Sequence, residues 1–473
     1  MDYFARYRDL IDDWDAFVAA VERPLPTTIW ANPLKITPDK LQTLMAEGGV
    51  ALTPVPWYPG AFRLPDGVMP GLRWEYLAGL YQVQEEAALL PALLLDPQPG
   101  ERVLDMCAAP GNKTAQMGAM MQNRGTLIAN DRSNGRMRAA RHALSRIGLV
   151  NVTTMTRDGA NLPGEMGLFD KIMVDVPCSC EGTCRKDPVV LERSSVGTSK
   201  KIARIQTALL RKAVQLCRPG GRIVYATCTF APEENELVLD AILRETGDTL
   251  RLCAAAVPGL TASPGLTEWQ GQPLHPDLHL SSRIWPQQND TGGFFVAVLE
   301  KIGNPLTVNG ERFLRLETEP GDLSPGNWMG MLVERFGLDT AVFDELAAVR
   351  WSNRGLYLVN RELQLPDGVR LDSPGLFFIR TGHRHAKMTT EATLLLGQHA
   401  TRNVIELTSP QAKTYLQRQI VTPTPAQTAS LTETGFVIMN YRGYPLGQGV
   451  FHTKSGQIES HFPKAWSRAD VQL

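Results

Sequence analysis

The strongest constraint on the fold lies in the middle of the chain, where short apolar runs alternate with segments of helical spacing. The runs "GERVLDMCAAPG", "GTLIAND" and "FDKIMVDVP" have the continuous apolar character of strands buried on both faces. The segments "NGRMRAARHALSRIG" and "SKKIARIQTALLRKAVQLCRPGG" have amphipathic helical spacing, and the second ends in a Pro-Gly-Gly stop. Strands that alternate with helices pair in parallel through crossovers, so the pattern predicts an α/β, doubly wound sheet. The strand "RIVYATCTF" and the helix "PEENELVLDAIL" complete the predicted sheet domain.

Sheets of this kind bind ligands beyond the carboxyl ends of their strands. Four acids follow successive predicted strands, namely Asp105, Asp131, Asp158 and Asp175. A carboxylate accepts both hydroxyls of a ribose, so the set suits a nucleoside ligand, although any single member could instead cap the next helix. The first amides of the following helix, at Asn112–Thr114, offer donors to a carboxylate or phosphate. Neither GxGxxG nor a Walker-type GxxxxGKS occurs, so NAD and ATP find little support.

Composition narrows the class of protein. The 473 residues allow about three domains. The sequence contains no run long and apolar enough to span a membrane, and the charged, aromatic start "MDYFARYRDL" is unlike a secretory signal. The odd count of 7 cysteines argues against a secreted disulfide framework and predicts a cytoplasmic protein. The net charge of −1 means that any nucleic-acid surface must be a local patch.

Three motifs then resemble, in order and spacing, those of the RNA (cytosine-5)-methyltransferases of the Sun/Nop type. They are "LDMCAAPGNKT", "VDVPCSCEG", and "YATCT" followed by "PEENE". The resemblance covers Tyr81 to Lys301 and implies a Rossmann-like fold with S-adenosylmethionine as the methyl donor. The family usually has Gly or Ser where this chain has Asn112, and Asn tolerates a left-handed backbone.

Carried over residue by residue, the resemblance implies a cofactor site. Asp131 would accept the ribose hydroxyls, Asp158 would lie by the adenine, and Asp175 would lie between the cofactor and the base. The small residues of the loop would let the backbone approach the methionine moiety, and its lysine would supply a charge. This cofactor loop consists of Cys107, Ala108, Ala109, Pro110, Gly111, Asn112 and Lys113.

The resemblance also assigns the catalytic residues. Carbon 5 of cytosine is a poor nucleophile, and attack of a thiolate on carbon 6 makes it reactive toward a methyl donor. The family pattern gives the attack to Cys228 and the release of the product to Cys178. DNA cytosine methyltransferases use the cysteine of the "PC" motif as nucleophile, and spacing alone leaves both assignments open. Asp175 could hydrogen-bond the cytosine edge as charge develops there.

The stretch "VDVPCSCEGTCRKDP" raises the question of a metal, because Cys178, Cys180 and Cys184 stand close together. No second CxxC or HxxxH completes a set of four zinc ligands, so we predict no metal here. The family usually has Gly after "PCS", which makes Cys180 and Cys184 bystanders in this interpretation. Cys217 and Cys253 stand in apolar segments and are predicted to be small core residues.

Segments outside the sheet domain predict an RNA client. The N-terminal part resembles the small RNA-contacting module of the family, with Trp30 where the family often has Arg. The Gly-rich end resembles the C-terminal PUA-like domain of the bacterial enzymes that methylate small-subunit ribosomal RNA; a β-rich stability or dimer module is the alternative. The predicted division is an N-terminal RNA-binding module (1–75), the catalytic domain (76–302), a pre-PUA domain (311–403) and the PUA-like domain (404–473).

The predicted partner is therefore ribosomal RNA or the small ribosomal subunit, with transfer RNA as the second possibility, and we expect a monomer. A non-catalytic RNA-binding assembly factor is a separate hypothesis, opposed by the intact Cys178 and Cys228 pair; a DNA methyltransferase is a weaker one. Three basic groups are candidate phosphate contacts, with solvated helix faces as the alternative for the first two: Arg132, Arg136, Arg138, Arg141 and Arg146; Lys200, Lys201, Arg204, Arg211 and Lys212; and the segment Arg380 to Lys387.

Overall fold

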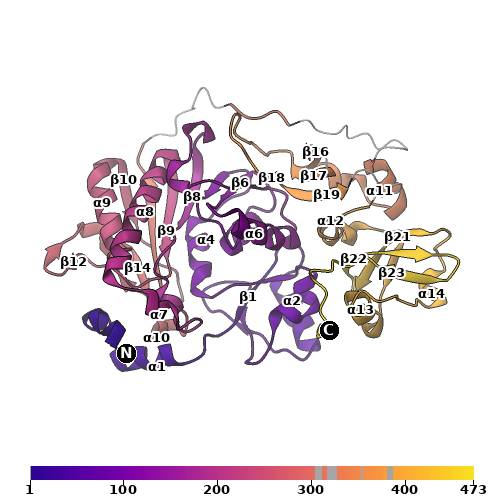
Figure 1. Ribbon diagram of the computed structural model, residues 1–473, viewed down its shortest axis with the longest axis horizontal. Helices are drawn as coiled ribbons and strands as arrows, with labels where there is room; N and C mark the ends of the chain where they lie inside the picture. The colour runs from indigo at the N-terminus through magenta and orange to yellow at the C-terminus, as the bar shows by residue number, and fades with distance from the viewer. Residues whose placement is uncertain (1, 304–311, 317–327, 353–354, 381–386) are drawn as a thin grey trace.

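A computed structural model of the chain describes residues 2–303, 312–316, 328–352, 355–380 and 387–473. It confirms the predicted α/β class: a large sheet with helices on both faces, flanked by smaller sheets near the two ends of the chain (Figure 1). Among the described helices, none combines the length and the apolar character that a membrane span requires.

The central sheet has the strand order of a doubly wound fold. Its parallel part runs in the order β7, β6, β5, β8, β9, so the chain reverses direction across the sheet between β5 and β8. Ligands bind at such a switch point. The parallel strands are β5 (Arg102–Asp105), β6 (Thr126–Asn130), β7 (Val152–Met155), β8 (Phe169–Asp175) and β9 (Cys217–Thr227). Antiparallel strands extend the sheet beyond β9, namely β15 (Phe294–Lys301), β14 (Ser282–Ile284), β11 (Ser263–Pro264) and β10 (Leu250–Cys253).

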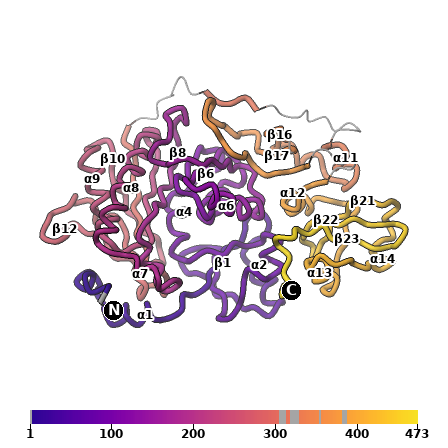
Figure 2. Tube along the Cα trace, viewed as in Figure 1, coloured from indigo at the N-terminus to yellow at the C-terminus, as the bar shows by residue number. Residues whose placement is uncertain are grey.

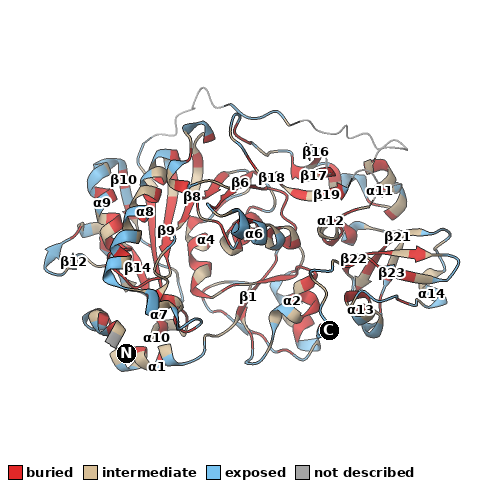
Figure 3. Cartoon of the chain, in the orientation of Figure 1, coloured by how far each residue is buried: buried red, intermediate tan, exposed pale blue. Residues whose placement is uncertain are grey.

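Both faces of this sheet are buried, as the continuous apolar runs predicted (Figure 3). Successive strand residues such as Val103 and Leu104 enter opposite core clusters. The first cluster lies under α4 (Leu90–Leu95), α5 (Asn112–Met120) and α6 (Asn134–Ile147), and the second lies under α8 (Val196–Leu216) and α9 (Glu236–Thr246). Because helices cover both faces of the sheet, a ligand can reach the parallel strands only at their carboxyl edge, where the loops that follow them lie.

Two predicted helix boundaries were wrong. Helix α8 ends at Leu216, and the Pro-Gly-Gly segment already belongs to β9. Pro disfavours helical backbone in the residue before it, so the helix stops ahead of Pro219. Helix α9 begins only at Glu236, because the residues 232–235 form turns whose side chains bind the neighbouring loops.

The N-terminal segment makes two separate units. The elements η1 (Asp2–Leu10) and α1 (Trp14–Glu22) pack on Phe230 and Trp285 of the sheet domain. A four-stranded antiparallel sheet follows. It consists of β1 (Thr28–Ala31), β2 (Thr53–Pro54), β3 (Ala61–Arg63) and β4 (Tyr81–Val83), with α2 (Pro38–Glu47) beside it. Because β4 follows residue 75, we propose a module boundary after Val83, which keeps this sheet in one unit.

The C-terminal part contains two further sheets. The first is formed by β16 (Leu346–Ser352), β17 (Gly355–Asn360) and β19 (Leu376–Arg380), and it packs with α11 (Trp328–Phe336), η9 (Thr340–Phe343) and α12 (Thr390–Leu396). The short β18 (Ser373–Pro374) pairs with β7 at the edge of the central sheet. The second sheet lies in the predicted PUA-like domain, with β20 (Val404–Glu406), β21 (Gly435–Tyr441), β22 (Tyr444–His452), β23 (Gln457–Ser460), α13 (Ser409–Leu416) and α14 (Pro425–Thr428).

Short elements make up the remaining ordered segments. They are η2 (Pro70–Leu72), α3 (Trp74–Leu77), η3 (Ala87–Leu89), η4 (Gly159–Asn161), η5 (Gly164–Met166), η6 (Glu181–Thr183), α7 (Val190–Arg193), η7 (Gly247–Thr249), β12 (Glu268–Trp269), β13 (Gln272–Pro273), η8 (Pro276–Leu280), α10 (Pro286–Asn289) and η10 (Gly397–His399).

The PUA-like domain packs against the N-terminal sheet, although the two are far apart in sequence. One core cluster combines residues such as Leu41 and Trp74 with Tyr415 and Tyr441. The C-terminal tail lies beside this junction (Figure 2), where the Trp74 backbone N–H donates to the Gln472 carbonyl at 2.9 Å. The flanking domains therefore form one continuous body instead of separate modules on linkers.

Arg146, at the end of α6, fastens the N-terminal sheet to the catalytic domain. Its buried guanidinium donates to the Tyr76 carbonyl at 2.5 Å and to the Tyr81 carbonyl at 3.2 Å, and it lies 3.7 Å from the ring centroid of Tyr76. The Lys35 ammonium donates to the Arg146 carbonyl at 2.9 Å. The role of Arg146 is thus structural, and it leaves the predicted phosphate-contact group.

Replacing this arginine should destabilise the protein. Arg146→Met keeps most of the apolar stem but leaves buried carbonyls without a donor, so we expect a loss of about 2–4 kcal/mol in the free energy of unfolding. Arg138→Met, on the exposed face of the same helix, should change it by no more than about 0.5 kcal/mol. Urea unfolding of both variants measures the difference, and equal losses would contradict the assigned role.

Candidate active site

The two cysteines of the "PC" and "TC" motifs meet at the carboxyl edge of the sheet. Cys178 follows β8 and Cys228 follows β9, and these strands are neighbours paired through Asp175 and Ala226. The two Sγ atoms are 3.4 Å apart. Residues 50 positions apart in sequence therefore form one pair of thiols in contact.

The other two cysteines of the motif, Cys180 and Cys184, lie in different surroundings. Cys184 is buried among aromatic residues of the N-terminal helices, as expected of a bystander. Cys180, also predicted to be a bystander, lies beside the pair, with its Sγ 3.9 Å from that of Cys178. Cys217 and Cys253 lie in or against the core. All of the chain's cysteines lie within the described residues, and none forms a disulfide.

The three clustered thiols affect one another's protonation. Contacts with Cys180 and Cys228, together with burial, raise the pKa of Cys178. The contact with Cys178 lowers the pKa of Cys228, but Cys180 and burial outweigh it and the net direction is upward. Contacts with the other two thiols, with a contribution from Arg136, lower the pKa of Cys180. Because the groups titrate together, a proton lost by one sulfur changes the affinity of its neighbours for theirs.

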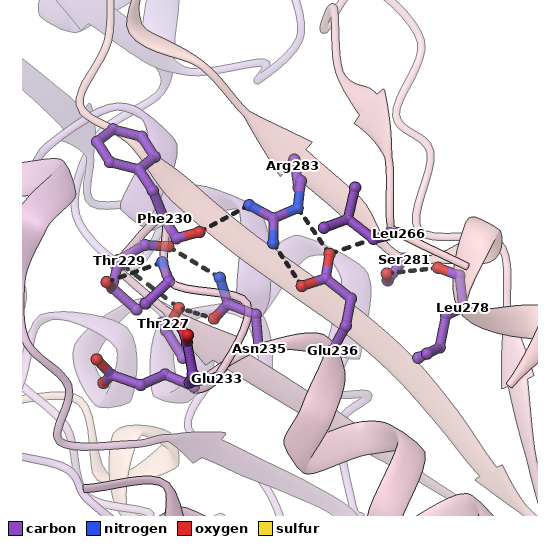
Figure 4. Close-up of polar contacts among 12 residues, drawn as sticks. Thr227, Thr229, Phe230, Glu233, Asn235, Glu236, Leu266, Leu278, Ser281 and Arg283 are labelled. Carbon is purple, nitrogen blue, oxygen red and sulfur yellow. Dashed lines mark hydrogen bonds and ion pairs between the residues drawn. The ribbon is translucent and has the colours of Figure 1, made fainter. Parts of the chain in front are cut away.

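Asn235 holds the loop that carries Cys228 (Figure 4). Its side-chain oxygen accepts from the Thr227 hydroxyl at 2.6 Å, and its amide donates to the Thr229 carbonyl at 3.0 Å. The residues on both sides of Cys228 are thus held by one buried side chain. This fixes the direction in which the Cys228 sulfur projects.

Glu234 holds the loop that carries Cys178. Its carboxylate accepts from the Ser179 backbone N–H at 2.9 Å and from the Gln206 amide at 3.0 Å. Burial raises the pKa of this carboxyl group. A bond of 2.7 Å between the hydroxyls of Ser179 and Thr229 then joins the two loops directly.

The neighbouring acids bind more distant segments. The buried Glu236 accepts from the Arg283 Nε at 2.6 Å and from the Leu266 backbone N–H at 3.1 Å (Figure 4). Glu233 accepts from Arg6 of η1 at 2.6 Å. The "PEENE" motif, predicted as the start of a helix, is therefore the anchor of the site, and sequence reasoning missed this role. Local sequence could not reveal it, because acidic residues are favoured in the first turn of any helix, and the acids of this motif therefore match an ordinary helix start.

The cofactor loop lies on the other side of the switch point. The Lys113 ammonium donates to the Asp175 carboxylate at 2.8 Å. Burial alone would lower the pKa of Lys113, but Asp175 outweighs it and the pKa is raised. Asp105, buried at the end of β5, accepts from the Thr114 hydroxyl at 2.6 Å, while its second oxygen has no partner among the described residues.

The loop backbone is tightly packed. Gly111 has φ 101°, and a Cβ there would lie 3.1 Å from Cβ of Ala140, so both conformation and space require glycine. Asn112 is the first residue of α5 and has helical backbone; the expectation of a left-handed residue was wrong for Asn112 and applies to Gly111. Ala108 and Ala109 are buried, Pro110 is exposed, and Cys107 lies partly buried at the core, where burial raises its pKa.

The two remaining acids differ in environment. The buried Asp131 accepts from the backbone N–H groups of Ser133 at 2.8 Å and Ala109 at 3.3 Å. Each carboxylate oxygen can accept further bonds, so ribose hydroxyls remain possible partners. Asp158 is exposed and caps η4 by accepting from the Ala160 backbone N–H at 3.1 Å, the helix-capping alternative of the sequence analysis.

These residues fit S-adenosylmethionine. The small residues of the loop allow the cofactor to approach the backbone closely. One oxygen of Asp105 has no hydrogen-bond partner among the described residues, and Asp131 can accept further hydrogen bonds. The structure thus groups the loop, Asp131 and the Lys113–Asp175 pair around the ends of β5, β6 and β8.

The predicted basic groups have mixed environments. Arg141 pairs with Asp372 at 2.7 Å, and Arg211 pairs with Glu245 at 2.7 Å. Trp30 is buried and donates to Gln84 at 3.0 Å, so it does not replace a surface arginine. Of the segment Arg380 to Lys387, only the two end residues lie within the described residues.

A groove of about 870 Å³ lies between α6 and the sheet β16–β17–β19. Arg138 and His142 line it from the helix, and Trp351, Tyr357 and Arg380 line it from the sheet. Arg380 lies over the Phe377 ring at 5.6 Å. Arginine beside aromatic rings is the combination that binds single-stranded nucleic acid.

Comparison with known proteins matches three parts of the chain to models of one group of enzymes. A family model described as "16S rRNA methyltransferase RsmB/F" matches residues 92–300. A model of the "N-terminal domain of 16S rRNA methyltransferase RsmF" matches residues 1–86, and one of the "Methyltransferase RsmF PUA domain" matches residues 402–468.

Individual proteins that are similar to this chain are also named methyltransferases. The chain is 32% identical to ribosomal RNA small subunit methyltransferase F of Aeromonas salmonicida, over 92% of this chain and 90% of that protein. It is 36% identical to tRNA (cytosine(49)-C(5))-methyltransferase of Pyrococcus abyssi, over 63% of this chain and 94% of that protein. A crystal structure of a methyltransferase homologue from Pyrococcus horikoshii superposes with a TM-score of 0.57 at 32% identity, covering 63% of this chain and 93% of that chain.

The protonation of Asp105 should be visible in the pH dependence of stability. Burial, with a contribution from Asp175, raises its pKa from 3.8 to about 7. The folded protein then keeps a proton that the unfolded chain releases, so this group lowers the free energy of unfolding as pH rises from about 4 to about 7. Asp105→Asn stays neutral and can still accept from Thr114. Its free energy of unfolding should therefore fall less steeply as pH rises, because the contribution of Asp105 to that fall is removed.

Urea unfolding of wild-type and variant at about pH 5 and about pH 8 tests this. At the lower pH only the first part of the decrease between about pH 4 and about pH 7 has taken place, so the difference in stability between the two proteins should be the smaller one and serves as the reference. At the higher pH the variant should be the more stable one. An unchanged difference between the two pH values would contradict the raised pKa.

Proposed function

Because the chain belongs to the RsmB/F family of S-adenosylmethionine-dependent RNA (cytosine-5)-methyltransferases, we propose that it methylates carbon 5 of a cytosine in 16S ribosomal RNA. The reaction proceeds through a covalent bond between Cys228 and the base. The observation that carries this proposal is the 3.4 Å distance between the sulfur atoms of Cys178 and Cys228.

The reaction needs a thiolate that attacks and a neighbour that assists its departure. The Cys228 Sγ attacks carbon 6 of the cytosine, and the new bond makes carbon 5 electron-rich. S-adenosylmethionine, when bound, supplies the methyl group. A base then removes the proton from carbon 5, and the bond between Cys228 and carbon 6 breaks, which regenerates the thiolate.

Cys178 is placed to act in this release. It lies against Cys228, and the Glu234–Ser179–Thr229 hydrogen bonds keep both loops in register. Asp175 stands at the end of β8, between the cofactor loop and the thiols, where it can accept a hydrogen bond from the cytosine edge. Its pairing with Lys113 keeps the carboxylate oriented toward the cofactor loop.

The cofactor site that we propose comprises the loop Cys107–Lys113 and Asp131, with Asp158 near the adenine. The backbone contacts of Asp131 hold its carboxylate at the end of β6, in the place where a ribose binds in doubly wound folds. Lys113 contributes charge to the same region.

Ribosomal RNA is favoured over transfer RNA because the family matches extend over both flanking domains. The similarity to the Pyrococcus abyssi enzyme, which the name gives as a tRNA methyltransferase, supports transfer RNA as the second candidate. We assign the groove between α6 and the β16–β17–β19 sheet to the bound RNA strand, because it combines Arg138 and Arg380 with aromatic residues. The free cysteines fit a cytoplasmic enzyme.

The roles of the two thiols predict that only one of the two alanine variants accumulates a covalent complex with RNA. Cys228→Ala should abolish turnover and form no covalent complex with RNA. Cys178→Ala should still attack and transfer the methyl group but release the product slowly, so a protein–RNA complex should accumulate and survive denaturing electrophoresis. The measurement uses labelled 16S RNA and S-adenosylmethionine.

Cys184→Ala, in the same loop as Cys178, is the matched control and should show no trapped complex. A trapped complex in Cys228→Ala and none in Cys178→Ala would reverse the two roles. Absence of any complex in all variants, together with full activity of Cys228→Ala, would exclude the covalent route.

Asp131→Ala should weaken S-adenosylmethionine binding. A lost hydrogen bond to a charged group is worth roughly 1.5–3 kcal/mol, which corresponds to about a ten- to hundredfold higher Kd. Calorimetry measures this Kd, and thermal unfolding without cofactor checks that the variant is folded. Asp248→Ala, an exposed acid after α9, should bind like the wild type; an unchanged Kd in Asp131→Ala would remove Asp131 from the site.

A further inference from the structure

The third thiol of the site has no role in methyl transfer as derived above. The sulfur atoms of Cys178, Cys180 and Cys228 all lie within 4.8 Å of one another. The pairs Cys178–Cys228 and Cys178–Cys180 are 3.4 and 3.9 Å apart. Cys184 points away into the aromatic cluster of the N-terminal helices, so the cluster differs from the three adjacent cysteines of the sequence motif.

Cys180 has an unfavourable backbone conformation in this position. Its φ of 62° lies in the left-handed region, which glycine adopts most readily and cysteine rarely. The Cys180 carbonyl accepts from the Thr183 backbone N–H at 2.9 Å and from the Thr183 hydroxyl at 2.8 Å, which fixes this conformation. A strained backbone that turns a thiol toward two others is a pointer to function.

The spacing of the sulfurs suits a tetrahedral metal ion. Zinc binds thiolates at about 2.3 Å, so two sulfurs on one tetrahedron lie about 3.8 Å apart. The two measured distances lie on either side of that value, and shifts of a few tenths of an ångström would bring them onto it. Three protein ligands leave a fourth position for water or for an added ligand.

The surrounding charges are compatible with such a complex. Three thiolates and one dication carry a net charge of −1, and the cations Lys113 and Arg136 act on Cys228 and Cys180 respectively. None of the three thiols is fully buried, so an ion can reach them from solvent.

We propose that Cys178, Cys180 and Cys228 form a binding site for a thiophilic divalent cation such as Zn²⁺. The ion holds the enzyme inactive, because it occupies both thiols that methyl transfer needs. Each thiol that is still protonated loses its proton to solvent, and three metal–sulfur bonds form between thiolates and the dication, with no change of oxidation state. The inhibitory consequence rests on the proposed function, whereas the binding of the ion does not.

The test uses full-length, reduced protein and Co²⁺ as the spectroscopic probe. Tetrahedral thiolate coordination gives visible d–d bands and near-ultraviolet charge-transfer bands, which Zn²⁺ should abolish by displacement. We expect one equivalent bound by the wild type and by Cys184→Ala, the control from the same loop. Cys180→Ala should bind at least about tenfold more weakly, since even changes beyond the metal's direct ligands cost about 10- to 100-fold in affinity.

Equal Co²⁺ affinity of wild type and Cys180→Ala, or bound Co²⁺ without thiolate charge-transfer bands, would overturn the site. The inhibitory role is tested by the methylation rate with Zn²⁺ divided by the metal-free rate of the same protein. This ratio should fall at lower Zn²⁺ in the wild type than in Cys180→Ala, and equal inhibition would overturn that role. Should the chain fail to methylate RNA at all, the Co²⁺ spectra would still decide the binding site separately.

Discussion

Four consecutive polar side chains, Glu233 to Glu236, hold the active site together. Buried carboxylates and amides require hydrogen-bond partners, so each of these side chains binds a different segment of the chain. Asn235 binds both sides of Cys228, and Glu234 binds the backbone beside Cys178. The distance between the sulfur atoms of Cys178 and Cys228 depends on these bonds, because neither loop lies within a helix or strand.

The Lys113–Asp175 pair joins the two halves of the site. Lys113 lies on α5, which follows the cofactor loop, and Asp175 ends the strand that leads to Cys178. Their ion pair crosses the switch point between β5 and β8, where the chain cannot connect the halves directly. This ion pair is therefore a direct contact between the cofactor loop's helix and the strand that leads to Cys178.

The flanking domains support the same geometry from outside. Tyr7 of η1 donates to the buried Glu181 at 2.8 Å, and Arg6 pairs with Glu233, so the first helix contacts both thiol-bearing loops. The PUA domain shares a core with the N-terminal sheet, which Arg146 fastens to α6. The outer parts are thus joined to the carboxyl edge of the sheet by buried contacts and have a fixed orientation relative to it.

Much of the site could be predicted from the sequence because it depends on strand ends. Parallel strands bring their carboxyl ends to one edge, so the acids and thiols that follow them had to lie near one another. The apolar runs and helical segments predicted the sheet, and the motif residues Asp105, Asp131 and Asp175 lie at the expected ends. Gly111 likewise follows from a local requirement, the left-handed turn into α5.

The sequence by itself thus determined the doubly wound sheet and the set of residues at its edge, since both follow from local periodicity and chain direction. Only the tertiary structure decided which thiols touch. Cys180 and Cys184 both follow Cys178 in the same motif, yet Cys180 lies beside the pair Cys178–Cys228 and Cys184 enters an aromatic core built by the distant N-terminus. It also decided that Arg146 is structural and that "PEENE" is an anchor. The physical reason is that burial, and hydrogen bonds between segments far apart in sequence, leave no periodic signal in the chain.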